Sequence, residues 1–348
     1  MRRNYWKNKK VLITGHTGFK GSWLSLILDQ MGAKVYGISL KEKKKSLFNY
    51  LNLKKIFKKN IYCNIGNKNL VKKNLYKINP EVIFHLAAQP LVIESFINPL
   101  KTLNANIIGT GNLLNASRRC SRLKVIVIIT SDKCYDSNIQ RSYKENDKLG
   151  GNDVYSASKA CTEIISAAYK ESFLKKKGIK LATARSGNVI GGGDFSSNRL
   201  IPDLMKAYKN NNICTIRNKE STRPWQHVLD PINGYIKLAE MLGVSKNKIY
   251  ESAWNFGPNN KSKKVIDVVK TVQTIIPIKI KYLTNNPESF RETKKLSLNS
   301  DKARKFLKWK NRINFYDTIK LTIEWHLNQS NKKKLMQITK KQISRIIN

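Results

Sequence analysis

The sequence has few of the side chains that form disulfides or bind metals. Its 348 residues include five cysteines and four histidines. The cysteines are odd in number and scattered, without a C-x-x-C pair, and the histidines have no ligand spacing. This pattern argues against a disulfide framework and against a zinc site. We expect reduced thiols, a cytoplasmic location and no bound metal.

Long apolar runs are also missing. No run approaches the roughly 18 residues that a membrane-spanning helix needs. The basic start MRRNYWKNKK passes directly into the apolar run VLIT, without the apolar region and cleavage site of a signal peptide. We therefore expect no association with a membrane.

Acidic residues are scarce, with 23 Asp and Glu against 66 Lys and Arg, which gives a formal net charge of +43. The basic residues are spread in short runs, such as Lys41–Lys45, and are interleaved with Asn and Ile. Such a diffuse positive field attracts anionic ligands and binds polyanions loosely. We do not expect a specific nucleic-acid partner.

Apolar runs typical of buried strands alternate with helical patterns through the first half of the chain. Strands are expected at Val11–Thr14, Lys34–Leu40, Ile61–Cys63, Val82–Leu86, Val125–Thr130 and Leu181–Ser186. Helices are expected at Lys20–Met31, Lys68–Ile78, Leu100–Ser117 and Tyr155–Leu174. This order predicts an α/β fold with a doubly wound parallel Rossmann sheet, covered by helices on both faces.

The rhythm changes after Arg185, where the segment SGNVIGGGDFSSNRLIPD is Gly-rich and irregular. The later elements are expected at Asp230–Leu242 (helix), Ile249–Phe256 (strand), a Ser-capped helix from Ser262, Ile278–Leu283 (strand), Asp301–Leu307 (helix) and Phe315–His326 (helix). We predict a Rossmann domain at 1–186 plus about 229–256. A smaller, discontinuous substrate-binding lobe is predicted at about 187–228 plus 257–330. The basic tail 331–348 is either a surface helix or disordered.

The first turn, VLITGHTGFKGSWL, carries Gly15, Gly18 and Gly21 between a strand and a helix. Glycines in this position allow the tight turn and let the backbone approach a pyrophosphate, which sits at the helix N-terminus. The turn therefore indicates a dinucleotide site. The second strand ends without an acidic residue before Glu42, so this local pattern does not separate NAD from NADP.

Two further strand ends carry candidate residues. After Val82–Leu86, the small Ala87 and Ala88 would let backbone lie against a cofactor, and Gln89 could face a substrate. After Val125–Thr130, the segment SDKCYD places Asp132 beside Lys133. Because open α/β sheets bind ligands outside the carboxyl ends of their strands, these residues are expected to meet at one crevice.

Tyr155 and Lys159 lie one helical turn apart, on one face of the helix that follows the Asp132 strand. Other Y-x-x-x-K matches occur in this lysine-rich chain, and position alone separates this one. Lys159 is expected to hold a nicotinamide ribose and to lower the pKa of the phenol from about 10 towards neutrality. A tyrosinate there would be a base for a hydroxyl proton.

A family resemblance emerges from segments that appear in order along the chain: TGHTGFKGSW, HLAAQPLV, TSDKCYD, LGGNDVYSASKACTE, ARSGNVIGGGDF, RLIPD and RPWQHVLDPINGY. Together they resemble the extended short-chain dehydrogenases/reductases, and within these the CDP-glucose 4,6-dehydratases. The resemblance runs from about Val11 to about Trp309. It implies bound NAD, CDP-glucose as substrate, CDP-4-dehydro-6-deoxyglucose as product, and a place in deoxysugar biosynthesis.

The resemblance also implies roles for individual residues. The implied catalytic residues are Ser131, Asp132, Lys133, Tyr155 and Lys159. The implied cofactor-binding residues are Gly15, Thr17, Gly18, Phe19, Gly21, Asn64, Ile65, Leu86, Ala87, Ala88, Gln89, Asn106, Tyr155 and Lys159. The implied substrate-binding residues are Gln89, Asn188, Arg199, Arg223 and Asn255.

Two alternatives remain open from the sequence. One keeps the fold and changes the substrate, giving another nucleotide-sugar 4,6-dehydratase or a nucleotide-sugar 4-epimerase. The other is a basic protein that senses NAD or binds polyanions on the same scaffold. The resemblance further implies a homodimer, through Leu100–Ser117 and Tyr155–Leu174, or a homotetramer built from two such pairs.

Overall fold

The computed structural model describes residues 3–136, 141–258, 262–283 and 296–347. Within these residues a seven-stranded sheet has the order β11-β6-β5-β4-β1-β2-β3, and every neighbouring pair is parallel. The strands are β1 (Lys10–Thr14), β2 (Lys34–Ser39), β3 (Lys59–Tyr62), β4 (Val82–His85), β5 (Val125–Ile129), β6 (Lys180–Ser186) and β11 (Ala253–Phe256). The predicted doubly wound sheet is confirmed.

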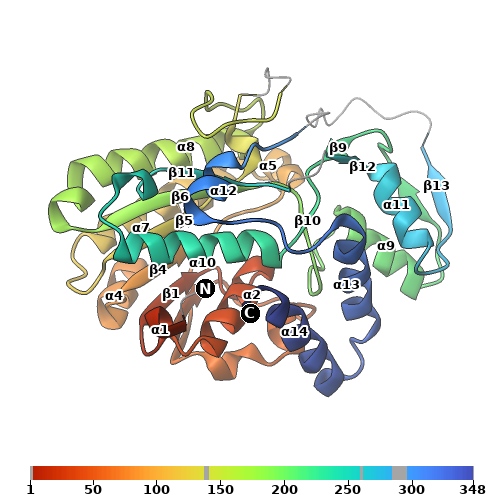
Figure 1. The fold of residues 1–348 in the computed structure, drawn as a ribbon, viewed down its shortest axis with the longest axis horizontal. Coiled ribbons are helices and arrows are strands. Elements are labelled where there is room, and N and C mark those ends of the chain that lie inside the picture. Colours follow the sequence, from red (N-terminus) through yellow and green to blue (C-terminus); the bar gives the residue numbers. More distant parts are fainter. Residues whose placement is uncertain (1–2, 137–140, 259–261, 284–295, 348) are drawn as a thin grey trace.

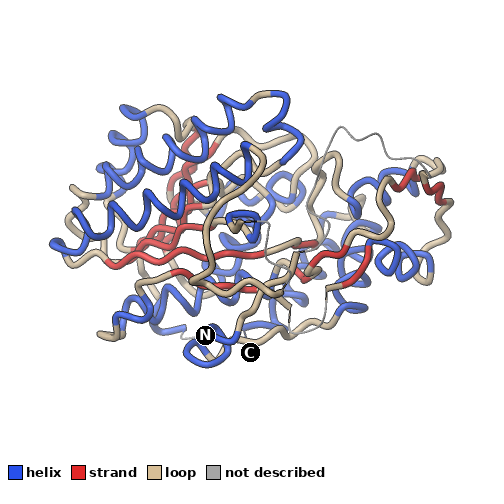
Figure 2. Tube along the Cα trace, turned by 90° about the horizontal axis from the view of Figure 1, so that it is seen from above, coloured by secondary structure: helices blue, strands red, loops and turns tan. Residues whose placement is uncertain are grey.

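Helices cover both faces of this sheet (Figure 2). The helices of the first half are α1 (Arg3–Trp6), α2 (Phe19–Gln30), α3 (Leu47–Tyr50), α4 (Lys68–Ile78), α5 (Val92–Ile97), α6 (Pro99–Leu103), α7 (Gly109–Ser117) and α8 (Val154–Tyr169). Side chains alternate along each strand. Val11 and Ile13 of β1 therefore join the core cluster with α2, whereas Leu12 joins a second cluster with α4 and α7.

The predicted helix Leu100–Ser117 is interrupted. A π-helical turn, Asn104–Ile108, separates α6 from α7. Another π-helical turn, Lys170–Leu174, extends α8. The first of these turns places Asn106 in the interior, 1% exposed. Single π turns of this kind occur frequently beside functional sites.

The second half of the chain contains a helix that the sequence did not suggest. Helix α9 (Leu200–Lys209) begins inside the segment predicted to be irregular. Pro202 lies in its first turn, where the missing N–H has no intrahelical partner to lose. Ile201, Leu204 and Met205 bury its apolar face. The helix is therefore stabilised by the helical spacing of its apolar residues, which pack into a hydrophobic cluster outside the main sheet.

The smaller elements form or adjoin that core. They are β7 (Val189–Ile190), β8 (Cys214–Ile216), β9 (Thr222–Arg223), β10 (Gln226–His227), β12 (Lys263–Lys264), α11 (Val265–Gln273), β13 (Ile280–Tyr282) and α13 (Phe315–Leu327). Several of them, such as α11 and β13, lie at the right of Figure 1. α10 (Leu229–Val244) and β11 instead return to the main sheet. The division into two domains with the ranges given above stays a prediction.

Two predicted boundaries were wrong. The helix expected from Ser262 begins at Val265, because Lys263 and Lys264 pair with β9 in an extended conformation. Asp267, not Ser262, accepts the backbone N–H of Lys264 at 2.9 Å, and the Ser262 hydroxyl donates to the Leu296 carbonyl. The strand expected at Ile249–Phe256 begins only at Ala253, after a 3₁₀ turn at Lys248–Tyr250.

The basic tail forms helix α14 (Lys332–Ile347), which packs on α10 and α13 (Figure 1). Helix α12 (Asp301–Leu307) packs on α10 and β11. Leu335, Ile343 and Ile346 are at most 1% exposed and belong to the main core cluster. Of the two alternatives for this tail, the packed helix is therefore the one observed. Within the described residues, no helix is long and apolar enough to cross a membrane.

Candidate active site

The turn between β1 and α2 brings its glycines against neighbouring backbone. Gly15 has φ of +73°, and a Cβ on Gly21 would lie 2.2 Å from the Gly15 carbonyl oxygen. Gly18 is the N-cap of α2, and no described side chain accepts a hydrogen bond there. Free N–H groups at a helix N-terminus bind phosphate, and glycine allows the close approach. The turn fits a dinucleotide pyrophosphate.

Two strand ends adjoin this turn. A Cβ on Gly15 would lie 2.7 Å from the Ala87 nitrogen, so the backbone after β4 lies directly against the turn. The Thr17 hydroxyl is 2.8 Å from that of Ser39 and donates to the Leu40 carbonyl, which joins the turn to the end of β2. Leu86 and Ala88 are half-buried beside Ala87, and Phe19 packs on the main core.

At the end of β3, Asn64 is exposed and its Oδ1 accepts the backbone N–H of Gly66 at 2.9 Å. Ile65 is buried beside it, 6% exposed. Asn64 lies at the same edge of the sheet as the glycine turn. This placement fits contact with the adenine end of a dinucleotide.

Gln89 and Asn106 make hydrogen bonds to each other and to the surrounding chain. Asn106 Oδ1 accepts the Gln89 N–H, and its Nδ2 donates to the Gln89 carbonyl and to the Ser158 hydroxyl. The Gln89 side chain binds both backbone groups of the nearby loop residue Leu91 and donates to Thr102. Asn106 therefore supports the loop from below, and the Gln89 amide is engaged within it.

Ser131 and Asp132 lie at the end of β5, 7% and 3% exposed. The Ser131 hydroxyl donates to Asp132 Oδ1 at 3.1 Å and accepts the Lys133 N–H at 3.2 Å. Burial raises the pKa of Asp132, against the opposing effects of Lys133, Ser131 and Arg223. Lys133 itself is half-buried. The adjacent acid and base thus lie where the protonated carboxyl is favoured by desolvation.

Tyr155 and Lys159 face the same crevice from α8, with Lys159 Nζ 6.0 Å from the centre of the Tyr155 ring. Burial raises the pKa of Tyr155 to about 12, while Ser131 and Arg199 act to lower it. Burial also lowers the pKa of Lys159 to about 8. The expected depression of the Tyr155 pKa towards neutrality is therefore not met, because desolvation raises this pKa.

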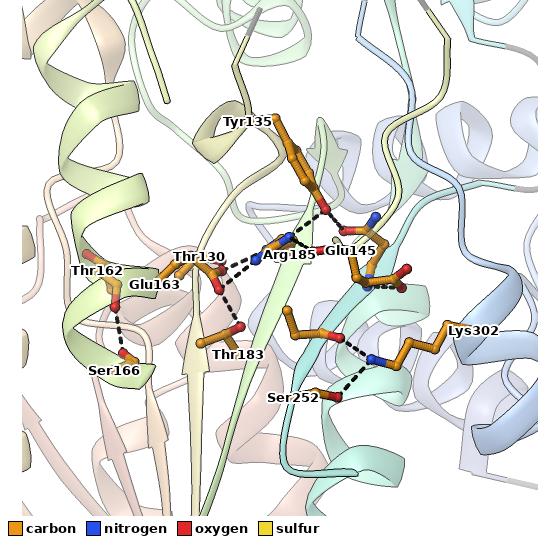
Figure 3. A network of polar contacts seen from close by, with 12 residues as sticks. Thr130, Tyr135, Glu145, Thr162, Glu163, Ser166, Thr183, Arg185, Ser252 and Lys302 are labelled. Atoms are coloured by element: carbon orange, nitrogen blue, oxygen red, sulfur yellow. Dashed lines mark hydrogen bonds and ion pairs between the residues drawn. The ribbon is translucent and has the colours of Figure 1, made fainter. Parts of the chain in front are cut away.

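A buried polar network holds α8 against the strands (Figure 3). Glu163, one turn beyond Lys159, accepts hydrogen bonds from Thr130, Thr183 and Arg185. Thr130 immediately precedes Ser131 on the chain. The network therefore sets the helix that carries Tyr155 relative to the strand end that carries Ser131.

The other four candidates for substrate contacts, apart from Gln89, have different surroundings. Arg223 is 4% exposed and lies near enough to Asp132 to lower its pKa. Arg199 forms an ion pair with Asp194 at 3.0 Å and acts to lower the pKa of Tyr155. Asn188 is half-buried between β6 and β7. Asn255 is fully buried, and its side chain binds the Tyr135 hydroxyl and the Tyr143 carbonyl. Asn255 thus acts within the network, and the other three lie near the crevice.

Lys20 was missed by sequence reasoning. It lies in the first turn of α2, and its Nζ donates to the hydroxyl of Ser186, the last residue of β6, at 2.8 Å. A cation in the first turn of a helix is unfavourable, because it opposes the helix dipole. A lysine at this position could therefore have indicated a functional residue from the sequence. In a chain with 66 Lys and Arg residues, that signal was not distinctive.

Among the described residues, no group of three or more His, Cys, Asp and Glu side chains could hold a metal ion. The polar groups of the crevice include hydroxyls, the Asp132 carboxyl, amines and the guanidinium groups of Arg199 and Arg223.

Comparisons with known proteins show the family of the chain. The family model described as GDP-mannose 4,6 dehydratase matches residues 12–322. The chain is 38% identical to the CDP-glucose 4,6-dehydratase of Salmonella typhimurium, over 98% of this chain and 97% of that protein. It is 23% identical to the dTDP-D-glucose 4,6-dehydratase of Homo sapiens, over 91% of this chain and 90% of that protein.

Solved structures share the fold. An epimerase from Methanothermobacter thermautotrophicus superposes with a TM-score of 0.81 and 22% identity, over 95% of this chain and 96% of that chain. A dTDP-glucose 4,6-dehydratase from Bacillus anthracis, in complex with NAD, superposes with a TM-score of 0.76 and 20% identity, over 94% of this chain and 99% of that chain. On the match of the family model and the similarity over nearly its whole length, the chain belongs to the GDP-mannose 4,6 dehydratase family.

Proposed function

We propose that this protein removes water from CDP-glucose to form CDP-4-dehydro-6-deoxyglucose. The observation that carries the proposal is the adjacent acid and base, Asp132 and Lys133, at the end of β5, with Asp132 close enough to Tyr155 to act on its pKa. The similarity to the Salmonella typhimurium CDP-glucose 4,6-dehydratase over 98% of this chain supports the cytidine nucleotide.

The proposed cofactor is NAD. The turn at Gly15, Gly18 and Gly21 would hold its pyrophosphate, and Lys159 would hold the nicotinamide ribose. Asn64 would contact the adenine, and the backbone at Ala87 would lie along the dinucleotide. When bound, NAD+ supplies the hydride acceptor and donor of the reaction.

Tyr155 is the proposed base for the C4 hydroxyl proton, and Ser131 would hydrogen-bond the same oxygen. A ketone at C4 acidifies the proton at C5. Lys133 would take this proton while Asp132 gives a proton to the departing C6 oxygen, and Lys133 would afterwards return a proton to C5. Water leaves, and the sugar shows no net redox change.

An acid–base pair in these roles needs Asp132 protonated and Lys133 neutral. The resting ion pair has the same number of protons, with one proton moved from the acid to the amine. Burial raises the pKa of Asp132, which supports the protonated carboxyl that these roles need. The working form can therefore arise without exchange of a proton with solvent.

The nucleotide part of the substrate is assigned to cationic side chains. Arg223, almost fully buried near Asp132, is the first choice for the CDP pyrophosphate, because a fixed guanidinium matches phosphate oxygens. Arg199 and Asn188 are the proposed further contacts. Gln89 and Asn255 are assigned supporting roles, because their side-chain groups are engaged within the protein.

We also propose a homodimer and a cytoplasmic location. Apolar side chains are exposed on the helices where the dimer contact is expected, including Leu100 (77%), Ile108 (53%) and Ile164 (56%). Exposed apolar surface of this kind marks interaction sites. The five cysteines are unpaired, and four of them are buried, which suits a reducing compartment.

The test is mass spectrometry of the nucleotide sugar after incubation of the purified protein with CDP-glucose, with and without added NAD+. dTDP-glucose, UDP-glucose and GDP-mannose serve as parallel substrates. Loss of one water from CDP-glucose alone is the expected result. Water loss from a different nucleotide would contradict the cytidine assignment. An unchanged mass with altered C4 configuration would instead identify a 4-epimerase.

A further inference from the structure

The amine of Lys20 is held in a fixed position by two rigid elements. It donates to the Ser186 hydroxyl at 2.8 Å, and the Tyr235 hydroxyl of α10 donates to the same oxygen at 2.8 Å. Ser186 is 2% exposed and Tyr235 is fully buried. The Lys20 side chain thus runs from the glycine-rich turn to the carboxyl end of β6, across the edge where the candidate catalytic residues lie.

One oxygen of Asp132 lies beside the same strand end. A Cβ on Gly187, the residue after Ser186, would lie 2.9 Å from Asp132 Oδ2. Within the described residues this oxygen is buried and has no hydrogen-bond partner, whereas Oδ1 is bound by Ser131. A buried carboxyl oxygen without a partner is costly, which indicates that a ligand supplies the missing partner.

Lys20 and Asp132 also influence one another electrostatically. Lys20 acts to lower the pKa of Asp132, and Asp132 acts to raise the pKa of Lys20. Burial outweighs this effect at Lys20, and its pKa falls to about 7. The amine can therefore lose its charge near neutrality, and it remains a hydrogen-bond donor in both forms.

We propose that Lys20 and Asp132 together bind one hydroxyl group of the sugar, the C6 hydroxyl that departs as water. The inference rests on the proposed function. A hydroxyl donates one hydrogen bond and accepts two, so it fits between an amine donor and the free Oδ2. Ionised phosphate oxygens can only accept hydrogen bonds, whereas a hydroxyl can pair with Oδ2 whether Asp132 is charged or protonated, which favours a hydroxyl at this point.

In the elimination step, Lys20 donates a hydrogen bond but transfers no proton. The C6–O bond breaks and its electron pair goes to oxygen, which takes a proton from Asp132 and leaves as water. The electrons of the C5–H bond form the C5–C6 double bond, and that proton goes to Lys133. Lys20 donates to the departing oxygen and stabilises the negative charge that develops there. Lys20 is thus a substrate-binding residue at the leaving group.

The experiment compares the affinities of CDP-glucose and CDP-6-deoxyglucose, which lacks only the C6 hydroxyl. Isothermal titration calorimetry is run in a Tyr155→Phe background, and chromatography checks that the sugar is unchanged. We expect the background protein to bind CDP-glucose about tenfold more tightly than the deoxy sugar, and Lys20→Met to bring this ratio close to one. Lys20→Arg, which keeps a donor, is expected to retain part of the preference.

Exposed Lys55 provides the matched control, since Lys55→Met removes one positive charge from the surface and should leave the ratio unchanged. Ser186→Ala releases the amine without removing it and should lower the ratio about threefold; it also carries the test if Lys20→Met does not fold. An unchanged ratio in Lys20→Met or Ser186→Ala would overturn the assignment of Lys20. Failure of the background protein to bind either CDP sugar would overturn the proposed function itself.

Discussion

Glu163 and Arg185 form a buried, two-pronged ion pair behind the candidate active site. Arg185 Nε and Nη2 donate to different carboxylate oxygens of Glu163, each at 2.9 Å, and the Arg185 and Glu163 side chains are 3% and 4% exposed. The same carboxylate accepts the hydroxyls of Thr130 and Thr183 (Figure 3). One side chain of α8 thus joins the ends of β5 and β6, and it aligns Tyr155 with Ser131.

Glu163→Gln should destabilise the protein by about 3–5 kcal/mol, because it leaves the Arg185 charge buried without its counter-ion. Denaturant unfolding followed by circular dichroism measures the change. Glu171→Gln is the control, since Glu171 pairs with Lys175 at the surface and its loss should have little effect. Equal midpoints for the two variants would show that the buried pair does not hold these elements together.

Gly21→Ala should abolish dinucleotide binding or weaken it at least about tenfold, because its Cβ would lie 2.2 Å from a backbone oxygen and 2.8 Å from the His16 Cα. Calorimetric titration with NAD+ measures the affinity. Gly111→Ala in α7 is the matched control, since no atom lies within 4 Å of its added Cβ. The control should bind normally and gain about 0.5–1 kcal/mol of stability. Normal NAD+ affinity in Gly21→Ala would exclude this turn as the binding site.

Lys159→Met should be more stable than the parent protein at pH 7, by up to about 3 kcal/mol. Burial lowers the pKa of Lys159 from 10.5 to about 8, and each unit corresponds to about 1.4 kcal/mol. Below pH 8 the folded protein must keep this charge buried. As pH rises from 8 to 10.5, the folded form loses the proton before the unfolded form does, so the penalty disappears.

The difference in unfolding free energy between the two proteins should therefore narrow across that interval. Denaturant unfolding at a series of pH values gives the difference, and Lys55→Met controls for loss of an exposed charge. A difference in unfolding free energy that stays constant, or widens, from pH 8 to 10.5 would contradict the burial of the Lys159 charge.

Lys133→Met should lose exchange of the C5 proton with solvent, because the proposed base is removed. The measurement is deuterium incorporation into the nucleotide sugar in heavy water, followed by mass spectrometry. Asp132→Asn should retain some C5 exchange while water loss falls by at least about a hundredfold, since it removes the proton donor for the C6 oxygen. Exchange that persists in Lys133→Met would assign the base to another group.

Ile164→Glu should shift the protein from dimer to monomer, because it places a charge in the centre of the proposed helical contact. Ile164 is 56% exposed on α8. Sedimentation velocity measures the mass, and Ile213→Glu, at an exposed apolar residue outside α8, is the control. A monomeric parent protein, or an unchanged dimer in Ile164→Glu, would reject this surface.

The sequence by itself determined the elements whose signals are local. Strands such as Val125–Ile129 are continuous apolar runs, and the glycine-rich turn requires residues without a Cβ, so the pattern of residue types locates both. The order of strands and helices then dictated the parallel sheet, and the sheet brought Asp132 and Tyr155 to one edge.

Only the tertiary structure decided which polar groups meet. Lys20 reaches Ser186, which lies 166 positions later, and the Asn255 amide turns into the interior towards Tyr135 instead of facing the crevice. The same packing buries Tyr155 and Asp132 and raises their pKa values. Burial and long-range contacts depend on the positions of all surrounding elements, and spacing along the chain does not contain this information.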